Sequence, residues 1–92
     1  MFKELLKTLK DGKAEYCFQK EDLLFISPVQ GFKADTDCLE IRFQGGYVKL
    51  WRGEEESEIK QVERPANLIV ECKACYLLKN GKGEFIGYIF ER

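Results

Sequence analysis

The chain contains no histidine. This excludes Ser-His-Asp and Cys-His catalysis, zinc binding through imidazole and pH switching by histidine. Serine is nearly absent, and the glycine-rich motifs Gly-x-Gly-x-x-Gly and Gly-x-x-x-x-Gly-Lys-Ser/Thr, which cradle dinucleotides and nucleoside phosphates, do not occur. The carboxylates, lysines and cysteines that remain form no recognisable catalytic pattern. We therefore expect a protein that is not an enzyme and that carries no cofactor.

Long apolar runs and an excess of charge of one sign are also missing. No run approaches the roughly 18 apolar residues of a membrane span. Fifteen basic and sixteen acidic side chains give a net charge of −1, which makes nucleic acid or an anionic membrane an unlikely main partner. The first residues lack the apolar core of a signal peptide, so we expect a cytoplasmic protein. Its 92 residues suit a single domain over 1–92.

An amphipathic helix is expected over residues 2–11. Phe2, Leu5, Leu6 and Leu9 follow the spacing of one helical face, and Gly12 supplies a stop. The segment from Phe2 to Lys13 resembles the helix that begins many small phage and bacterial accessory proteins. That resemblance implies an accessory or regulatory factor of this type.

Beyond the helix, the apolar residues alternate with a period of two. The pattern predicts strands over about 14–19, 22–27, 38–44, 47–52, 68–78 and 84–91, with an acidic loop over 53–64. Pro28 is expected to end the second strand, with a loop over 28–37. Three runs are apolar on both faces and are therefore expected to be central strands: 23–27, 68–78 and 84–91.

These elements predict an α+β fold in which the N-terminal helix packs on a curved antiparallel meander of about six strands, resembling a half-barrel. One short helix covers only part of such a sheet. The remaining apolar face must be closed by curling or covered by a second copy of the chain, so a homodimer is plausible.

The hairpin at 38–52 offers the strongest candidate surface. A Gly45-Gly46 turn would place Glu40 opposite Trp51, with Phe43, Ile41, Val48 and Leu50 on the other face. Aromatic and basic side chains then share one face, which is typical of protein-interaction hot spots and of single-strand nucleic-acid binders. The alternative is that these aromatics belong to the core. The candidate residues are Trp51, Tyr47, Arg42, Lys49 and Arg52.

Two other clusters are weaker candidates. Glu54, Glu55, Glu56 and Glu58 could dock a basic partner, although such runs are more often solvated loops. Cys72 and Cys75 have the spacing of a zinc-ligand pair. Inside a strand, residues three apart point to opposite faces, so we expect no metal there and treat the cysteines as small packing residues.

The function expected from these features is a small intracellular, non-enzymatic protein that acts by binding another protein or itself. The alternative from a different class is a small-ligand-binding domain, or a minor enzyme, with a pocket between the helix and the curved sheet.

Overall fold

The computed structural model describes residues 2–68 and 70–92, which form one helix and seven strands. The helix α1 spans Phe2–Lys10. The strands are β1 (Ala14–Lys20), β2 (Leu23–Ala34), β3 (Cys38–Phe43), β4 (Gly46–Trp51), β5 (Glu58–Val62), β6 (Ala74–Lys79) and β7 (Phe85–Glu91). The predicted α+β class is confirmed, with seven strands in place of about six.

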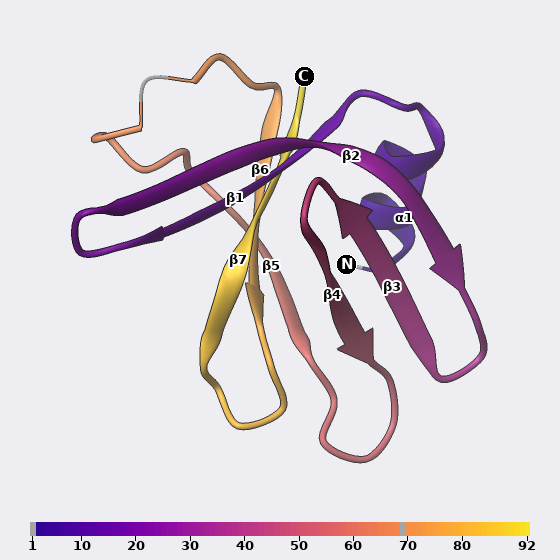
Figure 1. The fold of residues 1–92 in the computed structure, drawn as a ribbon. Coiled ribbons are helices and arrows are strands. Elements are labelled where there is room, and N and C mark those ends of the chain that lie inside the picture. The colour runs from indigo at the N-terminus through magenta and orange to yellow at the C-terminus, as the bar shows by residue number, and fades with distance from the viewer. Residues whose placement is uncertain (1, 69) are drawn as a thin grey trace.

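All seven strands belong to one antiparallel sheet with the order β4-β3-β2-β1-β7-β6-β5. The first four strands form one meander and the last three form another, and the pairing of β1 with β7 joins them. The sheet curls into a half-barrel (Figure 1). Its two edge strands approach each other where Trp51 meets Ser57: the Ser57 amide donates to the Trp51 carbonyl, and the Trp51 amide donates to Ser57 Oγ, both at 2.9 Å.

The main core lies inside the curl, where α1 covers the face that carries the apolar residues of β3 and β4. Leu5 and Leu9 of the helix are buried in one cluster with Leu39, Ile41 and Leu50. A helix of this length is barely stable alone, so docking of its leucine stripe on the sheet stabilises both. The described residues include no helix that could cross a membrane.

Strand β2 differs from the prediction, because it continues through Pro28 to Ala34 and there is no loop at 28–37. Its first half pairs with β1 and its second half pairs with β3 from Val29 onward, with an irregular register between Val29 and Gly31. Proline is tolerated because the strand changes partners there and the bend leaves no ladder bond for its missing N–H. The prediction that residues 23–27 form a strand covered on both sides is also wrong: residues 23–26 are exposed.

The β3–β4 hairpin has the predicted faces but not the predicted register. The turn consists of Gln44 and Gly45, so that Phe43 pairs with Gly46 and Trp51 lies opposite Cys38 instead of Glu40. Gly45 takes the positive φ of 88° that the turn requires. The hydroxyl of Ser27 also accepts the Gln44 amide at 3.0 Å. A slide of two residues preserves the alternation, which is why the faces were predicted correctly.

The second meander is shorter than predicted. Strand β6 begins at Ala74, not at residue 68, and Ile69 of the predicted strand lies outside the described residues. The acidic segment contains strand β5, and residues 80–84 form the turn before β7. Strands β6 and β7 do lie inside the sheet, as their two-sided apolar pattern predicted.

Candidate functional site

Three exposed side chains form a row along the outer face of β4: Tyr47, Lys49 and Trp51. They share this face because alternate strand residues point the same way, while Leu50 between them enters the core. Tyr47 is 60% exposed and Trp51 47% exposed. The Lys49 ammonium lies 5.8 Å from the centroid of the Tyr47 ring and 5.7 Å from that of the Trp51 ring. These distances allow cation–π attraction to both rings.

The neighbouring strand β3 adds charge of both signs to this face. Arg42 Nε donates to Glu40 Oε2 at 2.7 Å, and Glu40 pairs with Lys49 across the strands. The hydrogen bond from Arg42 lowers the pKa of the Glu40 carboxyl below its usual value. We refer to Arg42, Tyr47, Lys49 and Trp51 as the Trp51 surface. It offers two aromatic rings, the Lys49 ammonium between them, and a guanidinium that is hydrogen-bonded to Glu40.

Arg52, the fifth candidate, does not belong to the Trp51 surface. Its guanidinium carbon lies 4.9 Å from the centroid of the Phe2 ring, and its backbone amide donates to the Asp37 carbonyl at 2.9 Å. It therefore packs on the N-terminal end of α1. Alternation could have separated it from Trp51, because consecutive residues of an extended chain point to opposite faces and Arg52 therefore lies on the face of Leu50.

A shallow hollow adjoins Trp51 on each side. One, of about 290 Å³, lies over β2, β3 and β4 and is bordered by charges of both signs, including Lys33, Asp35 and Asp37. The other, of about 510 Å³, lies between Trp51, the acidic segment and the turn before β7. Trp51 therefore lies between two hollows, and a complementary protein surface can contact its side chain from both.

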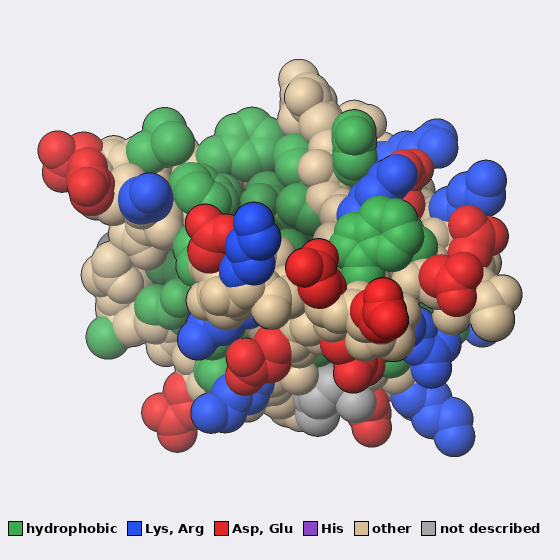
Figure 2. All heavy atoms as spheres, turned by 90° about the horizontal axis from the view of Figure 1, so that it is seen from below, with side chains coloured by type: hydrophobic (Ala, Val, Ile, Leu, Met, Phe, Trp, Pro, Cys, Tyr) green, Lys and Arg blue, Asp and Glu red, His purple; other side chains and the backbone are tan. Residues whose placement is uncertain are grey.

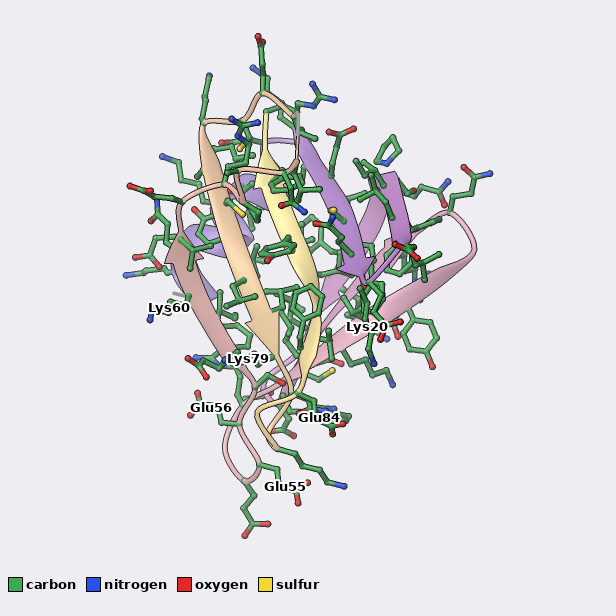
Figure 3. The ribbon with its side chains drawn as sticks, turned by 90° about the vertical axis from the view of Figure 1, so that its left-hand side faces the viewer. Lys20, Glu55, Glu56, Lys60, Lys79 and Glu84 are labelled. Atoms are coloured by element: carbon green, nitrogen blue, oxygen red, sulfur yellow. The ribbon has the colours of Figure 1, made fainter. Side chains whose placement is uncertain are left out.

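The acidic segment is held in place by the body of the protein. The Glu55 backbone packs against Gly81 so closely that a Cβ added at Gly81 would overlap it. Figure 3 shows the side chains of Glu55, Glu56 and Glu84 at one end of the sheet, where the acidic segment and the turn before β7 lie. Glu54 and Glu55 border the larger hollow with Trp51, whereas Glu58 is part of β5 and pairs with Lys79. The four glutamates thus do not form one group.

Much of the space between the helix and the sheet is filled by side chains. Leu5, Leu39, Ile41 and Leu50 have at most 2% of their surface exposed. A hollow of about 380 Å³ lies between the helix and the sheet beside this packing, bordered by Phe2, Lys3 and Leu6 of α1 and by Ala34, Asp35, Leu39 and Arg52. The small-ligand alternative depends on a pocket in this space, and it stays a prediction.

The cysteines are arranged differently from the prediction. Cys72 precedes β6 instead of lying within a strand, and it packs in the same outer cluster as Cys17, Leu68 and Cys75. The argument that Cys72 and Cys75 point to opposite faces is therefore wrong. Within residues 2–68 and 70–92, no group of three or more metal-ligating side chains is placed to hold an ion.

Two of these thiols have a raised pKa and so stay protonated at neutral pH. Burial raises the pKa of Cys17 to about 11 and that of Cys75 to about 12, with smaller contributions from neighbouring acidic groups. A nucleophilic or metal-binding cysteine needs the opposite shift, because the thiolate is the reactive form. The four cysteines are all free.

A second surface was missed by the sequence analysis. Leu23, Leu24, Phe25 and Ile26 of β2 are all large, apolar and exposed. The Phe25 ring lies 5.7 Å from that of Phe43, centroid to centroid, so apolar surface continues from β2 toward β3. Figure 2 shows a broad hydrophobic area on the face of the molecule seen from below. The two-sided apolar pattern of 23–27 was the available signal, but it was interpreted as a buried central strand.

No protein-family model matches the chain, and no curated protein or solved structure matches it either.

Proposed function

We propose that this protein is a small intracellular, non-enzymatic factor that acts by binding another protein through the Trp51 surface. The observation that carries the proposal is the exposure of Tyr47 and Trp51 on the same face of β4, with Lys49 between them. Tryptophan, tyrosine and arginine are the residues most enriched at interface hot spots. A regulatory or accessory role of bacterial or phage type accords with this function.

The charges around Trp51 favour a protein over a nucleic acid. Glu40 partly neutralises Arg42, and Asp35 and Asp37 border the hollow over β3. A single-stranded nucleic acid would bring phosphates close to these carboxylates, whereas its binders track the backbone with a positively charged groove. A protein partner can match mixed charges with its own.

The larger hollow suggests what part of a partner would dock there. It places the Trp51 ring beside the carboxylates of Glu54 and Glu55. An arginine or lysine side chain fits this combination, because the ring attracts a cation and covers its aliphatic stem. The acidic segment would then contribute as a secondary contact.

The chemistry of the cysteines supports the intracellular, non-enzymatic part of the proposal. Four free thiols are typical of a reducing compartment such as the cytoplasm. The two most deeply buried, Cys17 and Cys75, are held in the unreactive protonated form at neutral pH by burial, which raises the pKa of each.

The experiment uses Trp51 as its own reporter, because it is the single tryptophan of the chain. The partner is first captured from cells that express the protein, then purified and titrated into it. Burial of the indole should shift its emission to the blue. Trp51→Ala should weaken the affinity at least tenfold, measured by calorimetry.

Lysine substitutions give a matched control. Lys49→Ala on β4 should also weaken binding. Lys60→Ala should not, because Lys60, which is also an exposed lysine, lies on β5 and outside the Trp51 surface. An unchanged emission spectrum together with unchanged affinity of Trp51→Ala would refute the proposal. A blue shift produced instead by a single-stranded oligonucleotide would replace the protein partner with a nucleic acid.

Self-association is the second part of the proposal. Exposed apolar residues cluster on the first half of β2, which is separated from β4 in the sheet by β3. Contiguous exposed apolar surface of this kind marks interaction sites in water-exposed proteins.

A further inference from the structure

The first half of β2 has an edge on which its backbone is unpaired. The Arg92 amide donates to the Lys13 carbonyl, so odd-numbered residues of β1 face β7 and even-numbered ones face β2. In an antiparallel pair, hydrogen-bonded and non-hydrogen-bonded residue pairs alternate. Leu23 and Phe25, opposite Lys20 and Phe18, therefore bond to β1. The amide and carbonyl groups of Leu24 and Ile26 point the other way.

No described strand takes up these outward groups. Strand β3 pairs with β2 only from Val29 onward, and the hydrogen bonds of the turns in the described chain do not reach Leu24 or Ile26. Pro28 is the next residue whose backbone faces outward, and it has no N–H to offer. The open edge is thus a short window, closed by the hairpin turn at one end and by Pro28 and β3 at the other.

Within residues 23–26 this edge lacks the charged side chains that usually protect an edge strand from pairing. Natural edge strands carry lysine, an inward charge, proline or a bulge to prevent association. Residues 23–30 contain no charged side chain, and Pro28 stands only at the end of the window. Leu23 is 60% exposed and Leu24 52% exposed, and they lie on opposite faces of the strand. Both faces of the window are therefore apolar and open.

The occupant that fits this window is the same window of a second copy. A longer strand would collide with the Gln44-Gly45 turn, whose Gln44 amide is bound to Ser27 Oγ beside Pro28. The segment of another copy has the same length and ends. It is also uncharged, so two copies meet without like-charge repulsion, and an edge strand related to itself by a two-fold axis is antiparallel to its mate.

The exposed surface continues beyond the window. An interface of standard size buries about 800 Å² per partner. Every residue from Lys20 to Pro28 except Ser27 is exposed, so the contact can extend from the window along the β1–β2 hairpin.

We propose that two copies of this chain pair through the open edge of β2, antiparallel about a two-fold axis near Phe25, so that Leu24 of each copy lies opposite Ile26 of the other and their sheets become continuous. This proposal gives a surface to the self-association proposed above and is independent of the partner bound at the Trp51 surface. The backbone groups of Leu24 and Ile26 supply the hydrogen bonds, and the side chains of residues 23–26 supply the apolar contact.

Sedimentation velocity over a concentration series tests the dimer. Wild type should change from monomer to dimer as its concentration rises through the micromolar range. Leu24→Lys should raise the dimer Kd at least tenfold, because it places two like charges close to the two-fold axis, each opposite Ile26 of the other copy, while the far-UV circular dichroism stays that of the folded chain. Gln61→Lys, which adds the same charge at an exposed residue of β5, should leave the Kd within twofold of wild type.

Hydrogen exchange on the wild-type protein tests the geometry without any substitution. The amides of Leu24 and Ile26 should exchange rapidly in dilute solution and become protected at least tenfold as the dimer forms. The amides of Leu23 and Phe25, which bond to β1, should be protected at every concentration.

Three results would overturn the edge-pairing proposal: a monomer at millimolar concentration, a dimer whose Leu24 and Ile26 amides stay unprotected, or a dimer that Leu24→Lys leaves intact. If Trp51→Ala abolishes the dimer and Leu24→Lys does not, the copies meet through the Trp51 surface and the edge proposal alone fails. If Leu24→Lys abolishes the dimer while no partner binds at Trp51, the edge proposal stands and the Trp51 proposal fails.

Discussion

Gly87 allows the packing of the core to be tested quantitatively. It is buried in β7 with a φ of +139°, in the region that favours glycine. The Tyr16 ring lies directly over it, and the Tyr16 hydroxyl donates to the Ile86 carbonyl at 2.5 Å. A Cβ at this position would lie 2.7 Å from the Cζ of Tyr16 and closer still to Cε1. Gly87→Ala should therefore be strongly destabilising.

The magnitude follows from two separate effects. Overpacking a filled core lowers the free energy of unfolding by about 1–3 kcal/mol. A positive φ for a non-glycine residue adds about 1–3 kcal/mol. The sum, about 2–6 kcal/mol, compares with a total of about 5–14 kcal/mol for a domain of this size. Gly87→Ala should therefore remove a large part of the free energy of unfolding of the protein.

Urea unfolding at 25 °C measures this loss, and Gly31→Ala is the matched control. Gly31 is also a strand glycine, but nothing lies within 4 Å of its added Cβ and its φ is not in the left-handed region. This change should be neutral or stabilising by about 0.4–1 kcal/mol. Tyr16→Leu should reduce the penalty of Gly87→Ala in a double-mutant cycle, since it removes the ring. A Gly87→Ala protein within 0.5 kcal/mol of wild type would refute the packing described.

Three further predictions concern Trp51 and the cysteines. Trp51→Ala should lower the free energy of unfolding in urea by about 1–2 kcal/mol, well below the roughly 3–5 kcal/mol of a core tryptophan, because the ring is half exposed; a variant that fails to fold would mean that Trp51 supports the core. The free energy of unfolding should fall as pH rises above about 8.5 toward 11, because burial raises the pKa of Cys17 and Cys75 and the unfolded chain releases these protons first; a flat profile over this window would count against their burial. Cys72→Ala should lower stability by about 1 kcal/mol, and a chelator should leave the Tm of wild type unchanged; a large drop with chelator would show that metal contributes to folding.

Local pattern was enough to predict much of this fold. The leucine spacing and Gly12 placed α1 to within one residue. The period-two alternation of β3 and β4 assigned Trp51 and Tyr47 to the outer face and Ile41 and Leu50 to the core. These assignments survived an error in register because a shift by two residues keeps every side chain on its face.

The cysteines show where local pattern failed. Cys72 and Cys75 have strand-like alternation around them, yet Leu68 and Cys72 pack in one cluster with Cys17, Cys75 and Phe90. This packing depends on contacts between residues far apart in the chain, which no local period encodes. Arg52 is a different case: alternation places it on the face of Leu50, toward the Phe2 ring, so grouping it with Trp51 was an error in applying the pattern.

The sequence by itself determined which residues are apolar, where the period is 3.6 and where it is 2, and therefore one helix, most strands and their faces. Only the tertiary structure decided how the strands are shared. Strand β2 pairs with β1 in its first half and with β3 in its second. That change of partner at Pro28 leaves the apolar segment of residues 23–26 on an open edge. The same apolar pattern would be buried in a central strand, so burial followed from the curl of the sheet and not from the residues themselves.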